Sequence, residues 1–257
     1  MWDKDKEKAL LEVCKKYTAD APKNVIFPEP YLPYIPEDWK GILVLAESQM
    51  IKSTDDESYG GKLKRLSSVE KMSRLGEKEL QYKEGDIGVG PWDNGTIKLA
   101  LQAIFIGANL ELRLEDIAIS NAVPWTRKTT GTNLNPDKQM QDKAAEFWEK
   151  VLGIWEPDIK AMVVLGNVAE RVMTRKGIPE KYTKNWLKLR LPSPNAINRV
   201  SGMFDCDDLK FRFQEIQKAL DALEMSEEVE QYKMKVFFAC HAVSLGLEKF
   251  KKWFGGN

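Results

Sequence analysis

The feature that most constrains the fold of this chain is an alternation of short apolar runs with amphipathic helical stretches. The first run, residues 42–46, is wholly apolar and includes β-branched residues, and we expect further strands at 116–123, 159–165 and 186–191. A strand that is apolar along its length is typical of a parallel sheet covered on both faces. The sequence therefore predicts an α/β fold, a three-layer α/β/α arrangement with a central four-stranded, mainly parallel sheet.

Helical periodicity fills the intervals between these strands. It predicts helices at 4–17, 137–155, 208–225 and 227–254, one that opens at Gly95 and one that leads from the Gly166-Asn167 turn through Met173. We expect the four prolines of residues 27–36 to form an extended lead-in. The polar stretch 47–90 reads as a long functional loop with one helix near 67–81. The 257 residues suit a single domain, 1–257, with its core at about 25–222.

Composition excludes several classes of protein. The chain lacks the run of about eighteen apolar residues that a membrane span requires, and its first residues are charged, so we expect a cytoplasmic protein that does not enter the membrane. Three scattered cysteines predict neither a disulfide framework nor a zinc site. The one histidine, His241, lies in a helical segment and reads as structural. We expect no metal and no other cofactor.

A local excess of positive charge stands out against a net charge of zero. Between residues 171 and 199 a single acid, Glu180, accompanies eight basic residues: Arg171, Arg175, Lys176, Lys181, Lys184, Lys188, Arg190 and Arg199. Such a run is either a solvated surface or part of a nucleic-acid interface. Both interpretations stay open, because the run ends at a Pro-Ser-Pro turn whose hydroxyl and backbone donors suit a phosphate.

Three segments carry polar residues at or beside the expected ends of strands. They are Leu43-Val44-Leu45-Ala46-Glu47-Ser48-Gln49, Ser120-Asn121-Ala122-Val123 and Leu191-Pro192-Ser193-Pro194-Asn195. Ligands of parallel α/β sheets bind where the carboxyl ends of the strands emerge, so the three segments are expected to converge. In this order the segments resemble the signature of the uracil-DNA glycosylase superfamily, and the resemblance extends from about residue 27 to about residue 220.

The resemblance implies a monomeric, cofactor-free protein that flips a uracil or another deaminated or mispaired base out of DNA. Its base pocket would contain Asn121 to pair with the base edge, Tyr59 as a stacking platform, and Leu191. Glu47 and Ser48 occupy the catalytic segment, where Glu47 would orient the attacking water. The DNA-binding residues would be Ser193, Asn195, Ile197, Arg199, Asn167, Lys188 and Arg190, with Asn195 or Ile197 as the wedge. The Gly166-Asn167 turn, at the start of a helix, would contact a DNA phosphate.

Two positions depart from the pattern of this superfamily. Leu191 stands where its members usually carry histidine, and Ser48 replaces the aspartate of the best-known branch. Loss of one donor to the leaving group typically slows such a reaction a hundredfold or more. The sequence thus predicts slow hydrolysis of the N-glycosidic bond. The alternatives are a base-binding or nucleic-acid-binding protein without activity, and a vestigial site whose C-terminal helix serves a protein partner.

Overall fold

The computed structural model describes residues 4–25, 27–30, 32, 39–51, 95–128, 135–191, 213–225 and 229–255. Four strands form one sheet in the order β2-β1-β3-β4, and every pairing is parallel. The strands are β1 (Ile42–Ile51), β2 (Ala118–Lys128), β3 (Ala161–Leu165) and β4 (Trp186–Leu189). The expected four-stranded parallel sheet is therefore confirmed.

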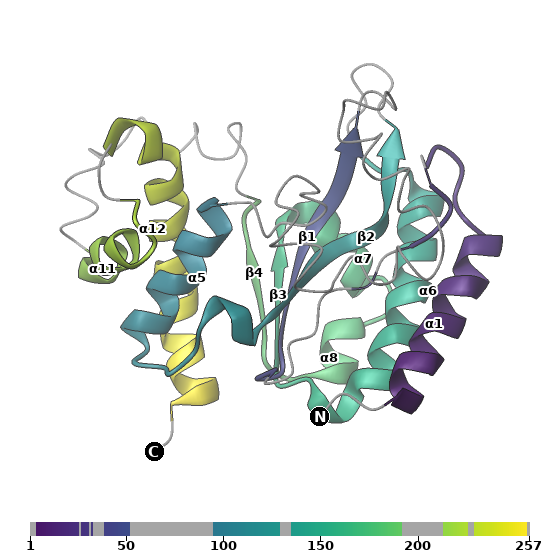
Figure 1. Ribbon diagram of the computed structural model, residues 1–257, viewed down its shortest axis with the longest axis horizontal. Helices are drawn as coiled ribbons and strands as arrows, with labels where there is room; N and C mark the ends of the chain where they lie inside the picture. Colours follow the sequence, from purple (N-terminus) through teal and green to yellow (C-terminus); the bar gives the residue numbers. More distant parts are fainter. Residues whose placement is uncertain are drawn as a thin grey trace.

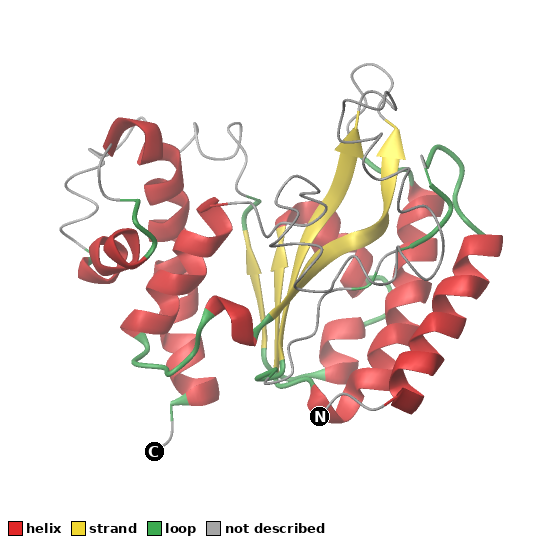
Figure 2. Ribbon diagram, viewed as in Figure 1, coloured by secondary structure: helices red, strands yellow, loops and turns green. Residues whose placement is uncertain are grey.

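Helices cover both faces of this sheet (Figures 1 and 2). One layer, called here the α5 layer, consists of α5 (Gly95–Gly107), α11 (Gln214–Ala222) and α12 (Val229–Phe254). The opposite layer, called the α6 layer, consists of α1 (Lys4–Ala19), α6 (Lys138–Trp155), α7 (Gly166–Thr174) and α8 (Ile178–Tyr182). The predicted three-layer α/β/α fold is confirmed.

Strand β1 shows why the central runs are apolar at every position. Ile42, Val44 and Ala46 belong to the hydrophobic cluster beneath the α5 layer, whereas Leu43 and Leu45 belong to the cluster beneath the α6 layer. Successive side chains of a strand point to opposite faces, so a strand covered on both sides needs apolar residues throughout. The sheet consequently separates two hydrophobic cores.

The α6 layer is built around aromatic residues. Helix α6 begins where Asp137 Oδ1 accepts a hydrogen bond from the Met140 amide at 2.8 Å, which satisfies one donor of the first turn. Its Phe147 ring meets Tyr17 of α1 edge to face, with the ring centroids 5.5 Å apart. The N-terminal helix expected at 4–17 therefore exists, continues to Ala19 and is part of the core.

Two strands are longer than expected. Residues 47–51 were assigned to the polar loop 47–90, which is wrong for this part, because β1 continues to Ile51 and pairs there with Lys128 of β2. Strand β2 continues past residue 123 through Pro124, close to the register shift between Ser48 and Met50. An edge strand tolerates proline and such irregularities. Strands β1 and β2 extend beyond the ends of β3 and β4, where they form a two-stranded ribbon (Figure 1).

Both helices expected near the C-terminus are present, and their described parts lie within the predicted bounds. The described part of the segment 208–225 contains α11, and α12 covers nearly all of the segment 227–254. The helix expected near 67–81 lies outside the described residues. Among the residues that are described, no helix is long and apolar enough to cross a membrane.

Candidate functional site

The topology places a switch point at the carboxyl ends of β1 and β3, where the chain leaves the two strands toward opposite faces of the sheet. Beyond β1 the described chain resumes in α5, on one face of the sheet, whereas β3 leads directly into α7 on the other face. In parallel α/β sheets, ligands bind at such a switch point, outside the carboxyl ends of the strands. The switch point is therefore the expected location of a ligand site.

The sheet register brings the predicted segments to one level at this edge. Asn121 of β2 pairs with Ala46 of β1, and Leu165 of β3 pairs with Leu189 of β4. Since Leu45 pairs with Val164, Ala46 and Leu165 stand side by side in the same row. Glu47 thus follows this row on β1, at the level where β3 ends and the chain turns into α7.

Glu47, Gly166 and Leu191 meet in one corner, which we call the Glu47 corner. Gly166 has a φ of +92°, and a Cβ placed on it would lie 2.6 Å from Glu47 Oε1 and 2.9 Å from Leu191 Cβ. Real Cβ atoms essentially never come so close, so a side chain at position 166 would force the Glu47 carboxyl group or Leu191 to shift. The glutamate of the first segment and the leucine of the last segment are therefore neighbours, as the resemblance predicts for these segments.

The Glu47 carboxylate is bound to the start of α7. Its Oε1 accepts a hydrogen bond from the Val168 amide at 3.2 Å, in the first turn of this helix. Helix N-termini attract negative charge, because their first amides have no partner within the helix. Glu47 therefore fills a position at the Gly166-Asn167 turn that the sequence assigned to a DNA phosphate.

The environment of Glu47 favours its neutral form. Burial raises the pKa of Glu47 above its ordinary value, whereas the Val168 amide and the positive charges of Arg127 and Arg171 act to lower it. Burial has the largest effect, so the pKa of Glu47 is raised overall. A carboxyl group with a raised pKa at the switch point is a candidate for acid–base chemistry.

Asn121 lies on the other face of the sheet. Its neighbour Ile119 contributes to the cluster under the α5 layer and Ala122 to the cluster under the α6 layer. Alternation along β2 therefore directs Asn121 toward α5, whereas alternation along β1 directs Glu47 toward α7. Asn121 is 4% exposed. The two predicted residues share one edge of the sheet but not one face.

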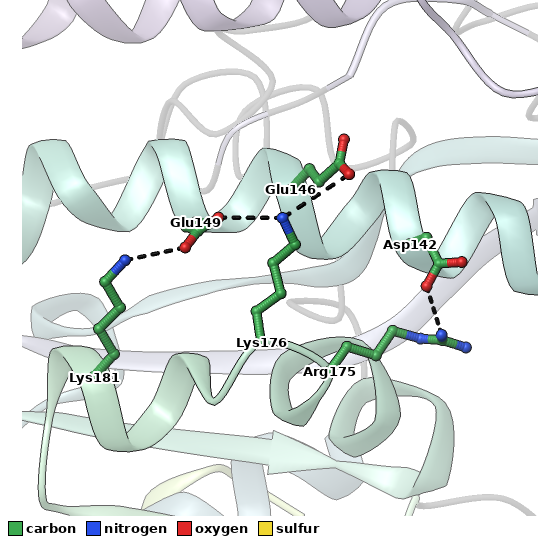
Figure 3. Close-up of polar contacts among 6 residues, drawn as sticks. All are labelled: Asp142, Glu146, Glu149, Arg175, Lys176 and Lys181. Atoms are coloured by element: carbon green, nitrogen blue, oxygen red, sulfur yellow. Dashed lines mark hydrogen bonds and ion pairs between the residues drawn. The ribbon is translucent and has the colours of Figure 1, made fainter.

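Three of the eight basic residues of the run hold helices together. Arg175, Lys176 and Lys181 form ion pairs with three acids of α6, namely Asp142, Glu146 and Glu149 (Figure 3). Figure 1 shows α8, which contains Lys181, at the end of the sheet away from the strand arrowheads. For these three residues the positive charge is matched by acids of a neighbouring helix.

The remaining predicted DNA contacts differ from one another. Lys188 pairs with Glu170 of α7, so its charge is already matched. Asn167 is exposed, and its carbonyl accepts a hydrogen bond from Arg171 Nε at 3.2 Å. Arg190 is exposed immediately after β4, beside the Glu47 corner. Arg190 is thus an exposed cation at this edge, and its charge also acts on His241 of α12.

Several predicted site residues cannot be placed. Tyr59, Ser193, Asn195, Ile197 and Arg199 lie outside the described residues. Ser48 pairs through its backbone with Val123, which locates it on the ribbon just beyond Glu47. The predictions for the stacking platform, the wedge and the Pro-Ser-Pro turn therefore remain predictions.

His241 and Cys14 are packed in the helical layers. Burial, with a smaller contribution from the charge of Arg190, lowers the pKa of His241 on α12. Burial raises the pKa of Cys14 on α1 to about 12, so its thiol is not a nucleophile at neutral pH. In the described part of the chain, no group of three or more histidine, cysteine or acidic residues could hold a metal ion.

The sequence reading missed two contributors to this site. Arg127 is buried on β2 and acts electrostatically on Glu47, but it lies beyond the strand end that was predicted. Gly166 was read as part of a phosphate-binding turn, and its contact with Glu47 joins residues more than a hundred positions apart. The Leu-Gly-Asn sequence after an apolar strand was the only local signal of a tight turn there. No protein-family model matches the chain, and no curated protein matches it.

Proposed function

We propose that the carboxyl edge of this sheet binds a flipped base of DNA and that the Glu47 corner hydrolyses its N-glycosidic bond. The base would be uracil or another deaminated or mispaired base. One observation carries the proposal: a half-buried carboxyl group with a raised pKa shares the Gly166 corner with Leu191, at the switch point of a parallel sheet. Slow turnover is expected, because Leu191 donates no hydrogen bond to the leaving base.

The reaction suits the residues at this edge. Breaking an N-glycosidic bond leaves positive charge on the sugar and negative charge on the base. Glu47 supplies a carboxyl group at this edge for the reaction, and Arg190 supplies a positive charge for the phosphate backbone. Asn121 would approach the base from the α5 side, and its amide offers both a donor and an acceptor to the base edge.

Incubation of the protein with oligonucleotides that contain uracil, hypoxanthine or xanthine tests the proposed activity. We expect abasic product from at least one of them, and a loss of about a hundredfold or more in rate for Glu47→Gln. The exposed Glu111 supplies a matched control, since Glu111→Gln removes a carboxylate far from the strand ends. If none of the three bases is released by the wild type or by Leu191→His, the proposed activity is wrong.

A second candidate function is base or nucleic-acid binding without hydrolysis. It is favoured by the hydrogen bond between Glu47 and Val168, because a carboxylate that caps α7 has a structural reason to be there. Under this candidate function Glu47→Gln leaves oligonucleotide binding intact and no base is released by any variant. The abasic-product assay thus decides between the two functions.

The two ends of β4 offer a controlled test of where nucleic acid binds. Arg190 follows the strand at its carboxyl end, and the exposed Lys184 precedes it at the other end. Arg190→Glu is expected to weaken oligonucleotide binding and to reduce its salt dependence by about one to two units of slope, whereas Lys184→Glu has little effect. Equal effects of the two reversals would remove the carboxyl edge from consideration as the binding surface.

A further inference from the structure

We infer that Glu47 is the proton donor to the departing base and not the activator of water that the sequence pattern indicated. This inference rests on the proposed function and assigns the chemical role of its central residue. The Glu47 carboxyl group lies beside residue 191, the position from which a donor to the base is missing.

Within the described residues, the geometry of the corner engages Oε1 of Glu47 and leaves Oε2 for this role. Oε1 accepts the hydrogen bond from the Val168 amide and abuts the backbone of Gly166. A neutral carboxyl group keeps its proton on one oxygen and accepts with the other. With Oε1 as the acceptor, Oε2 carries the proton. The contact with α7 thereby orients the acid instead of competing with it.

Among the residues that the structure describes, four groups act on Glu47 or share its corner. From α7 come the Val168 amide and the charge of Arg171, from β2 comes the charge of Arg127, and the segment after β4 contributes the apolar Leu191. The two arginines favour the carboxylate, whereas burial opposes it more strongly. A carboxyl group that donates a proton needs burial to favour its neutral form, because a fully solvated glutamate is already ionised at neutral pH.

The proton balance of the step is simple. The C1′–N bond breaks and its electron pair leaves with the base, while Glu47 transfers its proton to an oxygen or nitrogen of that base. A water molecule then adds to C1′ and loses a proton, and the Glu47 carboxylate takes up one proton before the next turnover. The sum is hydrolysis, and it requires no reactant except water.

The dependence of the single-turnover rate on pH distinguishes an acid from a base. With Glu47 as donor, the rate is constant at low pH and falls tenfold per pH unit above the pKa of Glu47. With Glu47 as the activator of water, the rate rises over the same interval. Arg171→Gln removes a nearby positive charge and is expected to move the descending limb to higher pH. An ascending limb, or a descending limb that Arg171→Gln leaves in place or moves to lower pH, overturns the inference.

The leaving group supplies an independent test. An anion of 5-fluorouracil is more stable than that of uracil and needs less protonation as it departs. Glu47→Gln is therefore expected to cost about a hundredfold with a uracil oligonucleotide and less than about tenfold with the 5-fluorouracil oligonucleotide. Equal losses on both substrates contradict the role of donor. Failure of the wild type to release either base contradicts the proposed function instead, so the two failures can be told apart.

Discussion

Substitution of Gly166 by alanine tests the structure of the Glu47 corner. A residue with a side chain at a φ of +92° costs about 1–2 kcal/mol, because its Cβ crowds the following carbonyl. The new Cβ would also lie 2.6 Å from Glu47 Oε1 and 2.9 Å from Leu191 Cβ. Forcing a methyl group into a filled space typically costs about 1–3 kcal/mol more. We expect Gly166→Ala to lower the free energy of unfolding by about 2–5 kcal/mol.

Gly177 supplies the matched control for this substitution. It also has a positive φ, +60°, but a Cβ placed there would meet nothing within 4 Å. Gly177→Ala therefore reports the backbone strain alone, about 1–2 kcal/mol. The difference between the two variants, measured by urea denaturation, isolates the close approach of Glu47 and Leu191.

A double-mutant cycle assigns this difference to its source. In a Glu47→Ala background the contact with Oε1 is absent, so Gly166→Ala should cost less there by about 0.5–3 kcal/mol. Equal losses for Gly166→Ala and Gly177→Ala, or a cycle without coupling, would refute the reasoning that Glu47 lies against Gly166.

Three further predictions concern stability. Burial raises the pKa of Glu47 in the folded chain, so the Glu47 side chain stabilises the fold most at low pH. The free energy of unfolding of the wild type, relative to that of Glu47→Gln, should fall as the pH rises from about 4 through that raised pKa. Denaturation at a series of pH values measures this fall. Asp137→Ala removes the N-cap of α6 and should cost about 1 kcal/mol in urea denaturation, with Asp137→Asn as the conservative control. Lys176→Ala should cost less than about 1 kcal/mol, and the loss should shrink at high salt, because its ion pair with Glu149 is partly exposed.

The fold followed from the sequence because its signals are local. The apolar run of residues 42–46 predicts a strand that is buried on both faces, and the periodicity of residues 137–155 predicts which side of α6 is buried. The ribbon formed by β1 and β2 did not follow, because Glu47 and its polar neighbours have the composition of a loop. Only pairing with a strand distant in the sequence makes them a strand.

The site was predictable in part for the same reason. Glu47 and Leu191 were singled out by their segments, and the parallel sheet does bring them together. The opposite direction of Asn121 depends on the register between β1 and β2, which composition does not encode. The pairing of Lys176 and Lys181 with Glu149 of α6 depends on how α7 and α8 pack, so the excess of charge in the run 171–199 overstated the positive surface.

Release of a free base, measured by mass spectrometry under single-turnover conditions, tests the central claim most directly. We predict that the wild type and Glu111→Gln release uracil or a related base from an oligonucleotide at similar rates. We also predict that Glu47→Gln, folded and still able to bind the same oligonucleotide, releases the base at least about a hundredfold more slowly. Equal release by Glu47→Gln and the wild type would contradict the claim that the Glu47 corner is the catalytic site.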